Sequence, residues 1–176
     1  MGAGGREFES LRPDQFSSVT AEEVIEKLRL ERHPEGGWFR RTYQSRNRLH
    51  LARGERFAGT CIYYLLEGEE HSALHRLRSD ETWFFHAGCG LVVHLFGENV
   101  YEKKRLGANL SAAEDPQLTI PAGTIFAAEL TKTSAWCLIG CSVCPGFDFT
   151  DFSWANLEEL RQRFPKRCEL IDRLKA

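Results

Sequence analysis

The chain has 176 residues, a length typical of one domain, and 42% of them are hydrophobic, enough for a sizeable core. The formal net charge is −2, so the overall charge gives no reason to expect nucleic acid or an anionic membrane as a partner. No apolar run approaches the roughly 20 residues that cross a bilayer. The first residues are Gly-rich and charged, so we expect a cytoplasmic protein without a secretory signal, whose six cysteines stay reduced.

The N-terminal region predicts a tail followed by a helix. Residues 1–12 are expected to form a flexible tail, and residues 13–176 a single domain. Thr20 and Glu23 have the spacing of a capping box. Apolar residues then recur at helical spacing, and the predicted helix ends near Arg32 because a proline follows shortly after.

From Trp38 onward the pattern is typical of short strands separated by turn residues. The main predicted strands are Phe57–Leu66, His71–Leu77, Glu81–His86, Leu91–Phe96, Val100–Leu106, Gln117–Ile120, Thr124–Glu129 and Ala135–Cys144. After Pro145 the chain is predicted to form two short helices, separated at Pro165. This pattern predicts an all-β fold, a jelly-roll (double-stranded β-helix) barrel with short N- and C-terminal helices. Barrels of this size have room for one small ligand.

The strongest candidates for chemistry are His75 and Glu81. A tight turn at Arg78–Asp80 would pair the strand that carries His75 with the strand that carries Glu81, so that both side chains point inward. An imidazole beside a carboxylate can bind a metal or act in general acid–base catalysis. A purely structural hydrogen-bonded pair is the alternative. We favour a functional pair, because burying two titratable groups is costly.

The spacing around these residues resembles the cupin superfamily. Glu81 and Gly88 have the separation of the first cupin motif, and His75 stands for one of its histidines with a longer spacing to Glu81. Ala73 occupies the position of the other histidine. In the second motif, which begins at Pro121, Phe126 replaces the histidine. Two of the four usual metal ligands are therefore absent.

The chain resembles one family within that superfamily more closely, the uncharacterised cupin-5 family. The matching motifs, in order, are His33-Pro34-Glu35-Gly36-Gly37-Trp38-Phe39, Ile62-Tyr63-Tyr64-Leu65-Leu66, Ser72-x-x-His75-Arg76, Asp80-Glu81-x-Trp83, Pro145-Gly146-Phe147-x-Phe149 and Asp151-Phe152. The resemblance covers roughly residues 20–174. It implies a cupin fold and a homodimer, and it says little about activity.

By analogy with metal-free sugar-nucleotide epimerases, which are also cupins, the resemblance implies an isomerase or epimerase that acts on a carbohydrate-like or other polar metabolite. His75 would be the base, Glu81 its partner, and Tyr63 would supply a phenolic proton. The predicted ligand contacts are Glu35, Tyr64, Ser72, Trp83 and Phe126. For Glu35, an ordinary turn position weighs about equally.

Two other functions stay open. A non-catalytic ligand sensor or store would use the same cavity without turnover. A divalent-metal enzyme would use His75 and Glu81 with help from His71, His86 or water, although His86 has the wrong strand parity for the inner wall. We expect no cofactor in the first two cases and a divalent metal in the third.

Three further groups of residues allow a functional reading. Six arginines, Arg40, Arg41, Arg46, Arg48, Arg53 and Arg56, could attract a phosphate or carboxylate at the barrel rim, although a solvated edge strand explains them better. Cys137, Cys141 and Cys144 have iron–sulfur spacing, but a strand would turn Cys144 away from the other two, which favours ordinary buried thiols. Asp148 and Asp151 are expected to cap a helix or tie down a loop.

Overall fold

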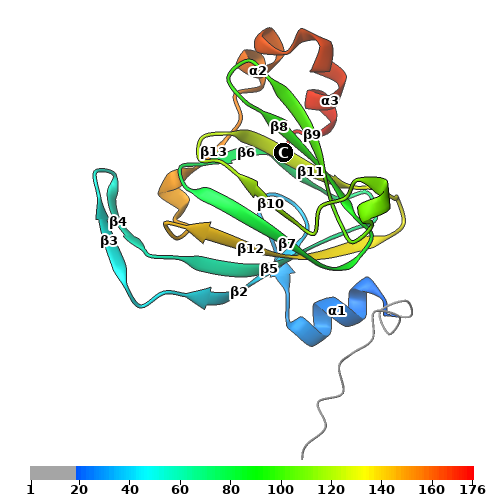
Figure 1. Cartoon of the computed structure of the whole chain (residues 1–176), viewed down its shortest axis with the longest axis horizontal. Coiled ribbons are helices and arrows are strands. Elements are labelled where there is room, and N and C mark those ends of the chain that lie inside the picture. The colour runs from blue at the N-terminus through cyan, green and yellow to red at the C-terminus, as the bar shows by residue number, and fades with distance from the viewer. Residues whose placement is uncertain (1–18) are drawn as a thin grey trace, which may run out of the picture.

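The computed structural model describes residues 19–176, which form two antiparallel β-sheets and a projecting hairpin (Figure 1). The predicted tail, residues 1–12, lies outside the described residues. The larger sheet has the strand order β1 (Glu31–Arg32), β2 (Trp38–Gln44), β5 (Thr60–Glu67), β12 (Trp136–Cys144), β7 (Asp80–Gly88) and β10 (Gln117–Ile120). The smaller sheet has the order β13 (Phe152–Trp154), β6 (His71–Leu77), β11 (Ile125–Leu130), β8 (Leu91–Phe96) and β9 (Tyr101–Leu106). The hairpin consists of β3 (Arg48–Leu51) and β4 (Gly54–Phe57).

The strand order confirms the predicted double-stranded β-helix barrel. Strand β12 lies between β5 and β7, and β11 lies between β6 and β8, so neighbours in space come from distant parts of the chain. Short helices occur at both ends of the described chain, as predicted. The expected strand Phe57–Leu66 is interrupted, because the backbone at Ala58 and Gly59 turns to bind Asn47 and Ser45.

Helix α1 (Ala21–Leu28) begins with the predicted capping box. Thr20 accepts a hydrogen bond from the Glu23 backbone, and the Glu23 side chain accepts one from the Thr20 backbone. Such a cap contributes about 1 kcal/mol. The predicted end near Arg32 was wrong by about one turn. Arg29 adopts a left-handed conformation (φ 53°), which ends the helix and lets the chain enter β1.

Helices α2 (Leu157–Arg163) and α3 (Cys168–Arg173) follow the barrel and cover the outer face of the smaller sheet (Figure 1). Their apolar residues Leu160, Phe164, Ile171 and Leu174 pack against Leu74 and Phe96 of that sheet. Burying each such side chain contributes about 1.5–3 kcal/mol. Short 3-10 helices occur at η2 (Leu110–Ala112), η3 (Phe149–Asp151) and η4 (Pro165–Arg167). Within residues 19–176, every helix is too short or too polar to cross a lipid bilayer.

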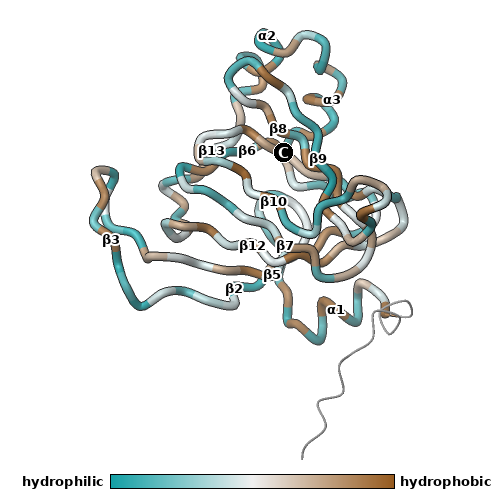
Figure 2. Tube along the Cα trace, viewed as in Figure 1, coloured by the Kyte–Doolittle hydropathy of each residue, from teal (hydrophilic) through white to brown (hydrophobic). Residues whose placement is uncertain are grey.

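The main core lies between the two sheets. It includes Tyr64, Trp83 and Ile139 from the larger sheet and Val93 and Phe126 from the smaller one, all buried. Figure 2 shows hydrophobic residues along β5 and β8 and mostly hydrophilic residues along β9, which is an edge strand. The side chains of this core fill one part of the barrel interior. The other part leaves space for a ligand.

Candidate functional site

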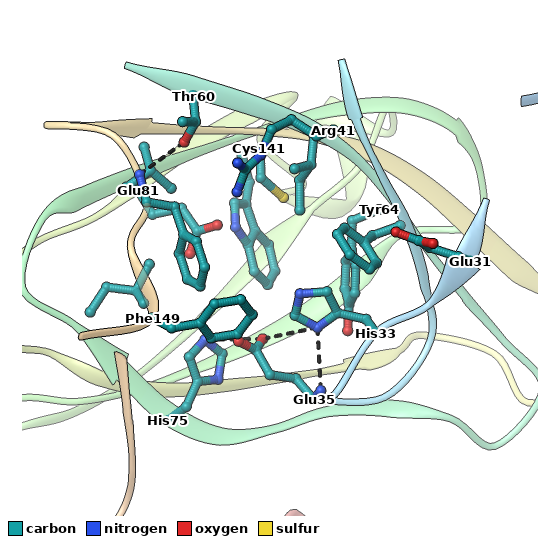
Figure 3. Close-up of a pocket in the computed structure, with 16 residues that line it drawn as sticks. Glu31, His33, Glu35, Arg41, Thr60, Tyr64, His75, Glu81, Cys141 and Phe149 are labelled. Atoms are coloured by element: carbon teal, nitrogen blue, oxygen red, sulfur yellow. Dashed lines mark hydrogen bonds and ion pairs between the residues drawn. The ribbon is translucent and has the colours of Figure 1, made fainter. Parts of the chain in front are cut away.

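A cavity of about 280 Å³ lies inside the barrel, between the larger sheet and β6 (Figure 3). Its volume is close to the lower limit for small-molecule pockets, roughly 300 Å³. Its aromatic lining consists of Phe39, Tyr64, Trp83, Phe147 and Phe149. Its titratable lining includes Glu31, His33, Glu35, His75, Glu81 and Cys141. The cavity thus combines ring-lined walls with a concentration of proton-carrying groups.

Glu35 is presented by the tight loop between β1 and β2. His33 N–H donates to Gly37 O at 3.0 Å, and Gly36 N–H donates to His33 O at 3.1 Å. Gly36 has a φ of +104°, a conformation that favours glycine. A Cβ there would lie 2.3 Å from His71 O, so the missing side chain lets the loop press against β6.

A β-bulge in β6 turns two polar side chains inward. Phe126 lies opposite His75, and Ala128 lies opposite Ser72. Ser72 and His75 are three positions apart, whereas their partners on β11 are two positions apart, so β6 contains one extra residue. Ser72 and His75 can therefore both face the barrel interior, where Phe126 and Ala128 also lie.

The backbone at this bulge connects two other parts of the chain. Ala73 N–H donates to Glu35 O at 3.0 Å, and Leu74 N–H donates to Leu174 O at 2.9 Å. His75 Nδ1 in turn lies 2.7 Å from Ala73 O. The same short segment therefore fixes both the loop that carries Glu35 and the ring of His75.

His75 and Glu35 are in contact inside the cavity. Because a carbonyl oxygen can only accept, His75 Nδ1 donates to Ala73 O and carries a proton. His75 Nε2 lies 3.3 Å from Glu35 Oε2. In the neutral imidazole Nε2 is an acceptor, so a proton must come from Glu35 for this contact to be a hydrogen bond.

Burial determines where that proton lies. Burial lowers the pKa of His75 to about 4, and it raises the pKa of Glu35 well above its usual value, with a further contribution from the charge of Glu81. Burial also lowers the pKa of His33 to about 4. At neutral pH both imidazoles are therefore uncharged, and the raised pKa of Glu35 favours its protonated form beside His75.

Glu81 is the second carboxyl group of the cavity. It lies on β7, opposite Val143 of β12, and is buried. Burial raises its pKa to about 7, and the neighbouring Trp83 indole and Cys141 thiol oppose this shift. Trp83 Nε1 is buried and has no hydrogen-bond partner in the described part of the chain. Glu81 is thus a carboxyl group that changes charge near neutral pH inside a ring-lined cavity.

Several predicted site residues lie in the cavity lining, namely Glu35, Tyr64, His75, Glu81 and Trp83. Ser72 and Phe126 lie directly behind the lining. The Ser72 hydroxyl partly opposes the rise in the pKa of Glu35. The Phe126 ring packs on the His75 ring, with the ring centroids 4.1 Å apart. Tyr64 Oη donates to Gly36 O at 2.8 Å, so its hydroxyl holds the loop.

The placement of Tyr63 in the site was wrong. Its side chain points to the opposite face of β5, because strand residues alternate between faces and Tyr64 faces the cavity. There Tyr63 packs edge-on against His86, with ring centroids 5.8 Å apart. His86 therefore lies outside the cavity, as its strand parity predicted. His71 also lies outside, with Nε2 3.1 Å from Lys175 O.

The predicted hairpin between His75 and Glu81 was also wrong. Strand β6 pairs with β11 and β13, whereas β7 pairs with β12 and β10, so the two strands belong to different sheets. The turn between them passes from one sheet to the other, where Arg78 N–H donates to Asp151 O. Both side chains line the cavity from facing sheets, and the carboxyl group in contact with His75 is that of Glu35 rather than Glu81.

Sequence reasoning did not place several lining residues in the cavity, namely His33, Arg41, Cys141, Phe147 and Phe149, although it considered Arg41 as an anion-binding residue at the barrel rim. Strand parity carried a signal for two of them. Arg41 lies on the same face of β2 as Phe39, and Cys141 was predicted to share a face with Cys137. Phe147 is held over the mouth because its N–H donates to Thr60 Oγ1 at 2.9 Å, a long-range contact without a local sequence signal.

Two residues of the arginine-rich segment, Arg53 and Arg56, form a cluster with the buried Asp151. Arg56 donates to both carboxylate oxygens of Asp151, at 2.8 and 2.9 Å, and Arg53 donates to Asp151 at 3.0 Å. Asp148 caps η3 by accepting from Thr150 N–H at 2.9 Å. The two aspartates therefore tie down the loop, as expected, and join it to the β3–β4 hairpin.

The side chains present do not fit a metal centre of the usual cupin type. Ala73 offers no donor atom, and the ring of Phe126 fills its position against His75. Within residues 19–176, no group of three or more His, Cys, Asp or Glu side chains is arranged to hold a metal ion. The cysteines agree with this, since Cys137 and Cys141 are buried and Cys144 is exposed, so the three thiols do not share one face.

Comparisons with known proteins identify the fold and the family. An uncharacterised protein of Saccharomyces cerevisiae is 25% identical over 166 residues, which cover 84% of this chain and 80% of the yeast protein. A hypothetical protein from Leishmania major has a solved structure with a TM-score of 0.83 and 33% identity, covering 90% of this chain and 99% of its own. A protein from Shewanella oneidensis gives a TM-score of 0.82 and 34% identity, covering 90% and 98%.

A more distant likeness is in fold alone. Oxalate decarboxylase from Bacillus subtilis is 16% identical, with a TM-score of 0.53, over 82% of this chain and 37% of the decarboxylase chain. That decarboxylase has Mn(II) centres. Residues 22–155 match the model of the family Cupin_5, described as "Cupin superfamily (DUF985)". The chain therefore belongs to the Cupin_5 family of the cupin superfamily.

Proposed function

We propose that the barrel cavity binds a small polar metabolite and catalyses a proton transfer on it without a metal, as an isomerase or epimerase does. The observation that carries this proposal is the contact between His75 Nε2 and Glu35 Oε2 at 3.3 Å. It places a group that holds one transferable proton in the same closed cavity as Glu81. Environments that give two carboxyl groups different pKa values are the usual basis of acid–base pairs.

Glu81 is the general base in this mechanism. Its pKa of about 7 gives a substantial ionised fraction at neutral pH, together with a basicity suited to removing a proton from carbon. The sequence alone indicated His75 as the base. We assign it to Glu81 instead, because the lone pair of His75 Nε2 faces Glu35.

The Glu35–His75 pair is the general acid. The raised pKa of Glu35 favours its protonated form, and in this mechanism His75 takes up or returns a proton through the same contact. A substrate between this pair and Glu81 would lose a proton to Glu81 and receive one from Glu35. Figure 3 supports this division, since Glu35 and Glu81 approach the cavity from different sides. The ring-lined wall, including Trp83, would limit access of water.

The reaction class is proposed by analogy with metal-free sugar-nucleotide epimerases, which are also cupins. The expected phenolic proton from Tyr63 is not part of the proposal. Tyr64 is the tyrosine of the cavity, and burial raises its pKa well above its usual value, so it stays uncharged and holds the loop.

The test is exchange of substrate carbon-bound hydrogen with solvent deuterium. Purified protein is screened with polar metabolites by thermal shift, and each ligand found is incubated in D₂O and followed by NMR. Wild type should exchange one C–H position, and Glu81→Gln and Glu35→Gln should each abolish exchange while leaving the protein folded. Tyr63→Phe is the matched control, because its hydroxyl lies outside the cavity, and it should exchange at the wild-type rate.

Other outcomes would favour the other functions. Saturable binding without exchange at any position would support a ligand sensor or store. Stoichiometric metal in elemental analysis, with activity lost on chelation, would support the metal enzyme. A homodimer and a cytoplasmic location stay predictions, which light scattering and imaging of a tagged protein would test.

A further inference from the structure

Contacts divide the arginine-rich segment into paired and unpaired side chains. Arg48 pairs with Glu55 at 2.7 Å, and Arg53 and Arg56 pair with Asp151. Arg41 forms no ion pair with any residue of the described chain. Its one side-chain hydrogen bond in the described chain is to Gln44 Oε1, at 2.9 Å.

Arg41 differs from its neighbours because it lines the cavity. It follows Phe39 on the inward face of β2 and lies opposite Ile62, which is also a lining residue. Arg40 points to the other face, with its guanidinium 5.8 Å from the centroid of Tyr63. Figure 3 shows the Arg41 side chain reaching over the cavity from β2.

The charges of the cavity make this arginine important. Among the described lining residues, Arg41 is the sole Arg or Lys. His33 and His75 have pKa values of about 4 and are uncharged at neutral pH, burial raises the pKa of Glu35 well above its usual value, and Glu81, with a pKa of about 7, changes charge in this range. Glu31 also lines the cavity, but it is exposed and makes no ion pair in the described chain. The lining therefore carries two exposed, unpaired charges, Arg41 and Glu31, around a polar interior in which Glu81 changes charge near neutral pH, and Arg41 is its one cationic group in the described chain.

We propose that the ligand of this cavity is a small organic anion whose carboxylate or phosphate group binds Arg41, while its uncharged polar body lies inside against Trp83, Glu35 and Glu81. Guanidinium groups bind such oxyanions through paired, charge-assisted hydrogen bonds. The unpartnered Trp83 Nε1 supplies a donor for an oxygen of the body. The inference deepens the proposed function, and it depends on the cavity being a ligand site.

The test compares probes that differ only in charge. Matched triplets, such as glucose 6-phosphate, glucuronate and glucose, or phenyl phosphate, benzoate and benzyl alcohol, are titrated into the full chain and followed by saturation-transfer NMR. We expect at least one anionic member of a triplet to bind more tightly than the uncharged member. The phosphate and carboxylate arms then distinguish the two oxyanions. Binding should weaken as salt concentration rises.

Variants separate the guanidinium from general charge. Arg41→Gln should weaken anion binding about tenfold or more and leave the uncharged probes unchanged. Arg41→Lys should restore part of the affinity, because a lysine keeps the charge but not the paired geometry. Arg46→Gln, at an exposed position outside the cavity lining, is the control and should bind like wild type.

Three results would overturn the inference: equal binding of charged and uncharged members, an Arg41→Gln variant that binds anions as wild type does, or no binding of any anionic probe. None of these measurements requires turnover. Anion binding that depends on Arg41 but is accompanied by no deuterium exchange would overturn the proposed reaction and leave this inference standing.

Discussion

Arg56 on β4 and Asp151 in η3 are 95 positions apart in the chain, yet two hydrogen bonds of 2.8 and 2.9 Å join them in the protein interior. This pair connects the projecting hairpin to the loop that carries Phe147 and Phe149 over the cavity. The hydrogen bonds from Arg56 lower the pKa of Asp151, and Arg53 adds to the effect.

We expect Asp151→Asn to destabilise the protein by about 3 kcal/mol, because two arginines lose their buried counter-charge. Urea denaturation at neutral pH would measure this. Asp172→Asn is the control, because Asp172 also pairs with an arginine, Arg161, but on the surface. It should cost less than about 1 kcal/mol. Equal effects of the two variants would contradict the prediction.

The same ion pair should make stability depend on acid. The folded-state pKa of Asp151 lies below the unfolded value, so its contribution is present above the unfolded pKa and is lost as pH falls through the folded one. Wild type should therefore lose stability relative to Asp151→Asn as the pH falls below about 4. Denaturation curves over that range would check this.

Glu81→Gln should remove a pH dependence of stability whose sign is opposite to that caused by Asp151. The pKa of Glu81 is raised from 4.5 to about 7, so the folded state binds the additional proton and loses stability as pH rises through that window. The variant should be more stable than wild type above pH 7, by up to about 3 kcal/mol, and similar to it near pH 4. Unfolding free energies at both ends of the window would measure the difference, and a variant less stable than wild type at high pH would count against it.

His94 should give a third, separate pH effect. It is buried in a network in which Nδ1 lies 2.8 Å from Tyr101 Oη and Nε2 lies 3.1 Å from Glu129 Oε1. Burial, together with Lys103 and other nearby positive charges, lowers its pKa to about 4. The unfolded chain binds a proton that the folded chain does not, so stability should rise as pH rises from about 4 to 6.5.

His94→Asn should reduce the slope of the unfolding free energy against pH, between about pH 4 and 6.5, by as much as about 1.4 kcal/mol per pH unit. His50→Asn is the matched control, because the His50 side chain is 87% exposed. Unchanged slopes in both variants would refute this role of His94.

Gly36→Ala should disturb the site more than Gly68→Ala. Both glycines have positive φ, but a Cβ at Gly36 would lie 2.3 Å from His71 O, whereas a Cβ at Gly68 would meet nothing within 4 Å. Gly68→Ala should therefore cost about 1 kcal/mol for backbone strain, and Gly36→Ala more. In Gly36→Ala the displaced loop should also shift the pKa of Glu35 toward its usual value, which carboxyl NMR titration would detect.

Local patterns were sufficient to predict most of the fold. Alternating apolar residues predicted strands such as His71–Leu77 and Leu91–Phe96, and the Thr20–Glu23 capping box predicted the start of α1. These features depend on contacts within a few residues. The end of α1 was misplaced, because the left-handed Arg29 that ends it carries no glycine or asparagine signal.

The site was predicted less well, because its geometry depends on long-range backbone contacts. Strand parity correctly separated His86 from Glu81, but Tyr63 was assigned to the cavity. The partner of His75 was missed because Glu35 reaches it through a loop anchored on Ala73, about forty positions away along the chain. Neither the bulge in β6 nor the division of β6 and β7 between two sheets has a clear sequence signal.

The bulge in β6 has a consequence for how this strand tolerates change in length. A strand normally presents every second residue to the same side, and β6 departs from that rhythm once, between Ser72 and His75. Deleting Ala73 or Leu74 would restore the regular alternation, with Ser72 and His75 still on the inner side. Deleting Ala73 would remove the amide that holds the Glu35 loop, and deleting Leu74 the amide that binds Leu174, so the extra residue of the bulge lets one short segment anchor parts of the chain near both of its described ends.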